Sequence, residues 1–305
     1  MTTYSATDAA LEGFRFTRER PRMLIVWALF LLTANAVGIG VMLLAPKEVQ
    51  EALATISSQE TPDGRQLMGA LGAVAPVLLL GLLIQRTMDA AVYRLMLRPE
   101  EKSFFFLRLG ADELRLAALR LIFVMMAILF LAVVQFGIVI LGLTALALGD
   151  TARIVVTSIT ELAAWIAFLV IAVRLSLASV ITFERKRLSI FESWAVTRGH
   201  ATRLLGAQFL ALCCAAVLGI LAFVIFSSVS GAAMLATGGS LADLRRVMSP
   251  ENLELRAYLN PFVLAWTLVG SLFSAVYAAA IPAPGAYIYK RIRGDVAESD
   301  EGTRA

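Results

Sequence analysis

Residues 117–148 read AALRLIFVMMAILFLAVVQFGIVILGLTALAL, and Arg120 is the only charged residue among them. A helix needs about 20 mainly apolar residues to cross the hydrocarbon core of a bilayer, and this segment is longer. Its polar and apolar side chains do not alternate as they would in a strand of a membrane barrel. Because unpaired backbone groups are costly in lipid, the segment predicts a transmembrane helix.

Five further segments share this apolar character. Hydrophobic residues make up 59% of the chain and charged residues 16%, whereas soluble domains are about half apolar and a quarter charged. The composition favours an all-α integral membrane protein with six transmembrane helices, which form a single membrane domain over residues 1–305. The expected spans are Met23–Leu44, Leu67–Ile84, Ala117–Leu148, Ile154–Val173, Gly206–Phe226 and Pro261–Ala286.

Basic residues lie mostly on one side of these spans. Of the 27 Lys and Arg residues, 21 fall on the side that carries both termini and 6 on the other side. Segments rich in Lys and Arg stay in the cytoplasm, so we expect both termini there. The net charge of +4 is explained by this flanking pattern, and we expect no nucleic-acid partner.

Three related segments each precede a pair of predicted spans. The first, LEGFRFTRERPRMLI, and the third, FESWAVTRGHATRLL, align without gaps, and the middle one is SFFFLRLGADELRL. Their aromatic anchors Phe14, Phe105 and Trp194 are separated by 91 and 89 residues, which indicates an internal repeat. The repeats would cover about residues 5–97, 98–183 and 184–293, followed by a polar tail at 294–305.

Each of these segments has the pattern of an amphipathic helix. In the middle segment, Arg108, Asp112 and Arg115 fall at i, i+4 and i+7, on one face of a helix. A helix of this kind lies in the membrane interface with its apolar face towards the lipid. Each repeat unit would then be an interfacial amphipathic helix followed by a helical hairpin. An ordinary cytoplasmic extension of the next span is the alternative.

Two arginines occupy near-equivalent places at the inner ends of spans. Arg86 and Arg174 lie 19 and 20 residues before Phe105 and Trp194. They either snorkel to lipid phosphates, with Asp89 as the i+3 partner of Arg86, or form a specific anionic-lipid site between hairpins. The lipid-binding candidates of the sequence, all basic, are Arg86, Arg174, Arg108, Arg115 and Arg198.

Three polar residues fall inside predicted spans. Glu161 lies about two turns into the fourth span, and an ionisable group at such a depth is a functional candidate for a transport or proton pathway. The alternative is an acid near the headgroups that is hydrogen-bonded to Thr157 or a neighbouring helix. Asn35 and Gln135 have the usual role of interhelical hydrogen bonds, with a substrate contact as the alternative.

No pattern in the chain indicates catalysis. His200 is the only histidine, and the sequence contains no HExxH pattern, phosphate-binding glycine loop or nucleophile elbow. Cys213 and Cys214 are adjacent in an apolar run, so a disulfide between them is not expected. We therefore expect no catalytic residue, no metal site and no cofactor.

One stretch resembles a known group of proteins. Residues 185–205, RKRLSIFESWAVTRGHATRLL, resemble a segment of uncharacterised bacterial polytopic membrane proteins related to the membrane domain of some glycerophosphodiester phosphodiesterases. The resemblance implies six apolar helices but no phosphodiesterase activity, because the catalytic module of those enzymes is a separate soluble barrel. The matched positions are Ser193-Trp194 and Thr197-Arg198-Gly199 of an SW-x-x-TRG pattern, and the closing stretch 282–289.

The sequence thus favours a non-enzymatic protein of the bacterial inner membrane that interacts with lipids or organises a partner. The expected partners are membrane lipids with anionic headgroups, another membrane protein, or further copies of the chain. A small-solute or ion transporter or channel with a polar pathway near Glu161 is the alternative. A membrane-embedded enzyme that acts on lipid headgroups is the third hypothesis.

Overall fold

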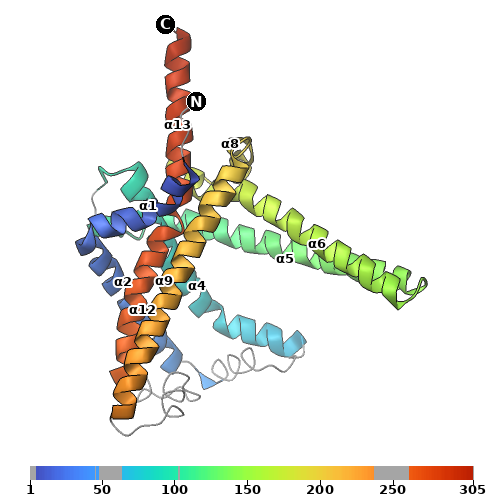
Figure 1. Cartoon of the computed structure of the whole chain (residues 1–305), viewed down its shortest axis with the longest axis horizontal. Helices are drawn as coiled ribbons and strands as arrows, with labels where there is room; N and C mark the ends of the chain where they lie inside the picture. Colours follow the sequence, from blue (N-terminus) through green and yellow to red (C-terminus); the bar gives the residue numbers. More distant parts are fainter. Residues whose placement is uncertain (1–4, 45, 48–63, 102–103, 237–260, 305) are drawn as a thin grey trace.

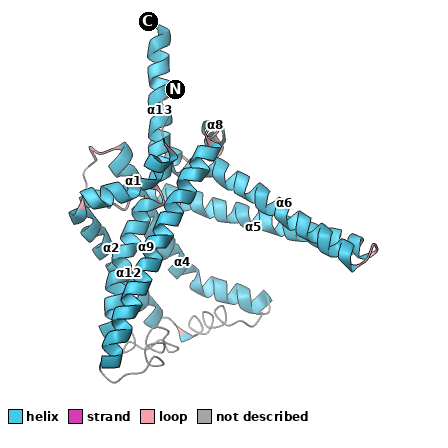
Figure 2. Cartoon of the chain, in the orientation of Figure 1, coloured by secondary structure: helices cyan, strands magenta, loops and turns pink. Residues whose placement is uncertain are grey.

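The computed structural model describes residues 5–44, 46–47, 64–101, 104–236 and 261–304, and these residues form helices and turns without any strand (Figure 2). Six of the helices are long and apolar enough to cross a membrane. In chain order, the elements are α1 (Ala6–Glu19), α2 (Pro21–Leu43), α4 (Gly64–Leu97), η1 (Phe104–Phe106), α5 (Ala111–Leu146), α6 (Asp150–Leu175), α7 (Ala178–Arg185), α8 (Glu192–Val196), α9 (Ala201–Ala236), α12 (Pro261–Ala280) and α13 (Ala283–Arg304).

The six expected spans are confirmed as helices, but several bounds differ. Helix α4 continues beyond the expected end at Ile84, and α9 continues beyond Phe226. The final span is divided at Ile281-Pro282, where α12 ends and α13 begins, because proline has no N–H to donate within a helix. The polar tail expected at 294–305 is helical to Arg304.

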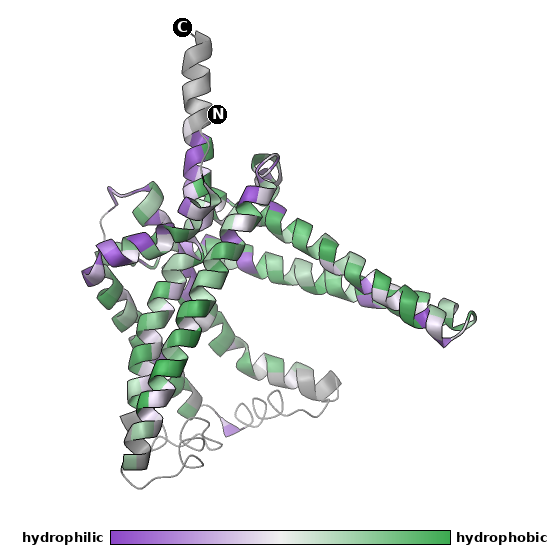
Figure 3. Ribbon diagram, viewed as in Figure 1, coloured by the Kyte–Doolittle hydropathy of each residue, from purple (hydrophilic) through white to green (hydrophobic). Residues whose placement is uncertain are grey.

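The long helices converge at one end of the molecule (Figure 1). We call this the basic end; α1, η1, α8 and the first turns of α13 lie there. Figure 3 shows hydrophilic residues gathered at this end and mostly hydrophobic residues along the long helices. Helices α2, α9 and α12 run together, whereas the hairpin α5–α6 diverges from them. The three pairs of spans therefore do not form one closed bundle.

The buried core lies at the basic end and not in the middle of the spans. The last three turns of α4, helix α7 and the start of α13 pack together there, together with Trp27 from α2. The ring centres of Tyr93 on α4 and Phe183 on α7 are 5.6 Å apart. Further along the spans, most large apolar side chains are exposed. Such exposure carries no hydrophobic penalty in lipid, because lipid tails are as apolar as leucine side chains.

Helix ends at the basic end are capped by side chains from other elements. The last carbonyl groups of a helix have no partner within it, and basic or hydroxyl side chains satisfy them here. These contacts connect segments far apart in the sequence. The capping bonds run from Lys290 Nζ to Met96 O (3.1 Å), from Arg98 Nη2 to Phe183 O and Glu184 O (2.9 Å each), and from Ser193 Oγ to Arg174 O (2.7 Å).

A buried ion pair fastens the hairpin α5–α6 to α4. Arg94 of α4 pairs with Glu113 in the first turn of α5, and the two side chains are 1% and 0% exposed. Arg94 Nη1 also donates a hydrogen bond to Phe106 O at 3.0 Å. Because both charges are removed from water, each depends on the other for compensation.

Helix α1 lies across the ends of α9, α12 and α13 (Figure 1). It begins after Ser5, whose Oγ accepts a hydrogen bond from the N–H of Thr7. A Cβ atom on Gly13 would lie 2.5 Å from the Cα of Ala280, so only glycine allows this approach. On the exposed face, a hydrogen bond to the Glu19 carboxylate raises the pKa of the Arg15 guanidinium.

Of the three predicted interfacial helices, only the first exists as a long helix, α1. The prediction for the middle segment is wrong, because η1 has three residues and Gly110 is extended just before α5 begins. Arg108 therefore lies outside the helix that carries Asp112 and Arg115. The positive φ angles of Phe105 and Phe106 coincide with hydrogen bonds from distant side chains to their carbonyl groups.

The third segment departs from the expectation in the same way. Helix α8 has only five residues, and Gly199 adopts a φ of 84° before α9 begins. This backbone conformation strongly favours glycine and separates α8 from the span that follows. The internal repeat and the interfacial location of α1 stay predictions.

Candidate functional site

A partly open cavity of about 950 Å³ lies between the hairpin α5–α6 and helices α4, α9 and α12. We call it the groove. Its volume is at the upper end of the roughly 300–1,000 Å³ typical of small-molecule sites. Phe123, Ala127 and Phe130 of α5 line it together with Phe168 and Ala172 of α6. The α5 residues recur at i, i+4 and i+7, so one apolar face of that helix forms a wall.

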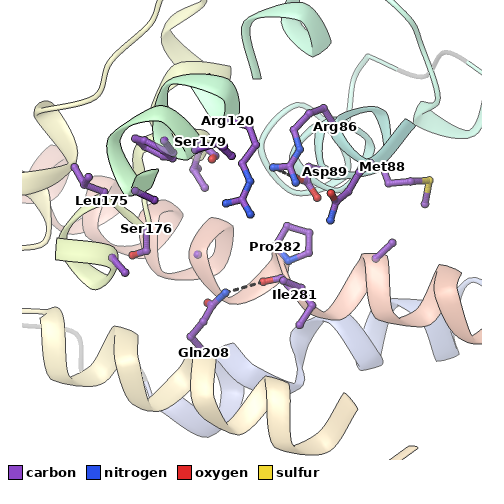
Figure 4. Close-up of a pocket in the computed structure, with 18 of the residues that line it drawn as sticks. Arg86, Met88, Asp89, Arg120, Leu175, Ser176, Ser179, Gln208, Ile281 and Pro282 are labelled. Carbon is purple, nitrogen blue, oxygen red and sulfur yellow. Dashed lines mark hydrogen bonds and ion pairs between the residues drawn. The ribbon is translucent and has the colours of Figure 1, made fainter. Parts of the chain in front are cut away.

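Polar side chains gather where the groove meets the basic end (Figure 4). They come from five elements that converge there: α4, α5, the α6–α7 junction, α7 and α9. The groove is therefore amphipathic. It is apolar between the spans, and we call its charged end, near the ends of the spans, the polar closure. The polar residues at the closure include Arg86, Asp89, Arg120, Ser176, Ser179 and Gln208.

Two of the charged residues neutralise each other. Arg86 Nη1 lies 2.6 Å from Asp89 Oδ2, and the two side chains are 11% and 13% exposed. The expected i+3 pairing of these residues on α4 is thereby confirmed. The buried Nε of Arg86 has no hydrogen-bond partner among the described residues. Arg86 therefore contributes a buried guanidinium to the wall, but little net charge.

Arg120 supplies the uncompensated charge of the groove. It projects from α5 towards the polar closure beside Arg86 and Asp89 (Figure 4). Among the described residues, its exposed side chain makes no hydrogen bond or salt bridge, and Asp89 is the acid on which its charge acts. The three charges at the closure therefore sum to +1. Sequence reasoning counted Arg120 among the basic flanks and missed its place on the helix face of Phe123 and Ala127.

Gln208 joins α9 to the division between α12 and α13. Its Nε2 donates a hydrogen bond to Ile281 O at 3.1 Å (Figure 4). Ile281 immediately precedes Pro282, so its carbonyl lies where the helical hydrogen bonding is interrupted. The side-chain oxygen of Gln208 remains as an acceptor at the edge of the groove.

Arg174 lies near the groove but does not line it. Its guanidinium sits 5.6 Å from the centre of the Trp194 ring, and its buried Nη1 has no partner among the described residues. Its carbonyl accepts hydrogen bonds from Ser193 and Thr197. The SW-x-x-TRG pattern thus has a local structural role, since its hydroxyl groups cap α6 and its tryptophan covers Arg174.

The other basic candidates also lie away from the groove. Arg108 is exposed between η1 and α5, and Arg198 is exposed between α8 and α9. Arg115 is partly buried and pairs with Asp112 at 2.6 Å. The structure does not bring these residues together with Arg86 or Arg120 at the groove.

The three aromatic anchors have different surroundings. Phe14 is half-buried and lines a second cavity of about 250 Å³ with residues of α9 and α12. Phe105 is 41% exposed and Trp194 is 46% exposed. The Nε1 of the buried Trp27 donates a hydrogen bond to Phe105 O at 3.0 Å, so the backbone of Phe105 carries this contact.

The polar residues predicted inside the spans are separate from one another. Asn35 on α2, Gln135 on α5 and Glu161 on α6 are all exposed, and none lines the groove or the second cavity. Among the described residues, no group of three or more His, Cys, Asp or Glu side chains is placed to hold a metal ion. Cys213 and Cys214 are free thiols.

No protein-family model, curated protein or solved structure matches the chain.

Proposed function

We propose that this chain is a non-enzymatic protein of the bacterial inner membrane that holds a membrane lipid in the groove. Both termini would lie in the cytoplasm. The observation that carries the proposal is the partly open apolar cavity that ends at the unpaired guanidinium of Arg120. This combination matches the two chemically different parts of a phospholipid.

The apolar wall suits an acyl chain. Residues of α5 from Phe123 to Val133 and of α6 from Phe168 to Leu175 line the groove along the direction of the spans. A chain that lies there would contact aromatic and aliphatic side chains along its length. The groove between the hairpin α5–α6 and helices α9 and α12 is partly open, so an acyl chain could enter it from the bilayer.

The polar closure suits a phosphate. Arg120 directly precedes the uncharged apolar run of α5, which would place it at the depth where headgroups meet the hydrocarbon core. A guanidinium presents several N–H donors that match the oxygen atoms of a phosphate. Arg86, held by Asp89, would fix the edge of the site, and Arg120 would contact the lipid.

The other hypotheses have less support from the described residues. A solute pathway near Glu161 would require a polar cavity there, and neither described cavity includes this residue. An enzyme acting on headgroups would need an activated nucleophile, and the one carboxylate among the described residues at the closure, Asp89, is paired with Arg86 and not with Ser176 or Ser179. The relationship to the membrane domain of glycerophosphodiester phosphodiesterases remains a separate proposal.

A space-filling substitution tests whether lipid occupies the groove. Ala127→Trp would place an indole inside the groove, whereas Ala132→Trp changes an exposed alanine on the same helix that does not line it. The measurement is native mass spectrometry of protein released from lipid nanodiscs. We expect the wild type and Ala132→Trp to retain lipid and Ala127→Trp to lose it. Equal retention in all three proteins would refute the proposal.

A further inference from the structure

We infer that the groove selects a lipid whose headgroup carries one negative charge, on a phosphodiester, and otherwise bears uncharged hydroxyl groups. This inference rests on the proposed lipid-binding function and adds the chemical class of the ligand. The observation behind it is the balance of charges at the polar closure. The Arg86–Asp89 ion pair is self-compensating, and Arg120 adds a single positive charge.

A phosphodiester is the group that this balance fits. Its one negative charge would neutralise Arg120 and leave the closure without net charge, which matters because charges are weakly screened next to an apolar cavity. A phosphomonoester carries about −1.5 to −2 at neutral pH, so it would leave an uncompensated negative charge beside Asp89. The Asp89 carboxylate thus disfavours a dianionic headgroup.

A zwitterionic headgroup is disfavoured for the opposite reason. Its phosphate would neutralise Arg120, but its ammonium group would add a positive charge within a closure that already contains two arginines. Asp89 is the only carboxylate among the described residues that line the groove, and its Oδ2 is already engaged by Arg86 at 2.6 Å. The net charge of the occupied site would remain +1.

Three groups at the closure can accept hydrogen bonds from hydroxyl groups on the headgroup. Gln208 donates a hydrogen bond from its Nε2 to Ile281 O, so its side-chain oxygen is left to accept a hydrogen bond from the ligand. Ser176 donates its hydroxyl proton to Val173 O at 2.7 Å. Its hydroxyl oxygen is therefore also left to accept a hydrogen bond. Asp89 Oδ1 is a third acceptor among the residues that line the groove. A headgroup with free hydroxyl groups, such as glycerol, supplies donors to these acceptors without adding charge.

Two variants that change the site charge in opposite directions test this inference. Nanodiscs with equal amounts of phosphatidylglycerol, phosphatidylethanolamine and phosphatidic acid provide the three headgroup classes, and native mass spectrometry identifies the lipid that stays bound. We expect the wild type to retain phosphatidylglycerol preferentially. Arg120→Gln should still hold lipid, with a preference for phosphatidylglycerol reduced roughly tenfold, as for the loss of one charge-assisted hydrogen bond. Asp89→Asn raises the site charge to +2 and should shift the preference towards phosphatidic acid.

Arg153→Gln is the matched control, because Arg153 is an exposed arginine of α6 that does not line the groove. This variant should keep the wild-type preference. If Asp89→Asn fails to fold, the headgroup preference of Arg120→Gln alone tests the inference. Wild-type protein that retains lipid in the proportions of the nanodisc would overturn the headgroup inference and leave the lipid-binding proposal intact. Wild-type protein without any bound lipid would overturn both.

Discussion

The buried ion pair between Arg94 and Glu113 yields the most quantitative prediction. The two side chains are 1% and 0% exposed, so removal of either one leaves the other charge buried without compensation. Such a loss costs about 3–5 kcal/mol of unfolding free energy. We expect Arg94→Met and Glu113→Leu each to destabilise the protein by this amount.

The double variant should cost much less than the sum of the two single variants. It leaves no buried charge, and apolar replacements of buried ion pairs are often neutral or stabilising. One loss remains, because Arg94 also donates to Phe106 O. A buried carbonyl left without a partner costs about 1–3 kcal/mol. We therefore expect the double variant to lose no more than about 3 kcal/mol of unfolding free energy. If the two substitutions acted independently, the loss would be roughly 6–10 kcal/mol.

The assay is reversible denaturant unfolding in mixed micelles, analysed as a double-mutant cycle. The control cycle uses Arg15 and Glu19, an exposed pair on α1 joined at 3.0 Å, which should show no measurable coupling. Additive effects of Arg94→Met and Glu113→Leu would refute the reasoning. Single variants that each cost less than about 1 kcal/mol would also refute it.

Three further predictions concern stability and the alternative function. Gly13→Ala should lower the unfolding temperature, because its Cβ would lie 2.5 Å from the Cα of Ala280. The control is Gly40→Ala, whose Cβ would have nothing within 4 Å and which should not lower the unfolding temperature. Trp27→Phe should cost about 1–3 kcal/mol in chemical unfolding, since it leaves a backbone carbonyl without its donor, and an unchanged unfolding midpoint would contradict this. Glu161→Gln should leave lipid retention in native mass spectrometry unchanged, because Glu161 does not line the groove; a loss of lipid would favour a functional site on α6.

Local patterns in the sequence predicted the features that depend on local physics. Six apolar runs predicted six long helices, because length and hydropathy are properties of each segment by itself. The pairing of Arg86 with Asp89 followed from i+3 spacing on one helix. The division of the last span was not predicted, although Pro282 is a local signal for it, since a proline in a helix removes a backbone donor.

Features that depend on distant contacts were missed. The pattern of the middle segment predicted a continuous helix, but Phe105 has a positive φ and receives a hydrogen bond from Trp27, 78 residues away in the sequence. Arg120 was only one basic flanking residue until the fold brought α5 opposite α4 and α9. The role of Gln208 likewise depends on a partner 73 residues away. Periodicity within a segment carries no information about such pairs.

The most direct test of the central claim is an electron cryo-microscopy map of the wild-type protein in lipid nanodiscs. We predict lipid density in the groove, with an acyl chain along Phe123, Ala127 and Phe130 and the phosphate within hydrogen-bonding distance of the Arg120 guanidinium. A map in which the hairpin α5–α6 closes against α9 and α12, leaving no lipid between them, would contradict the account.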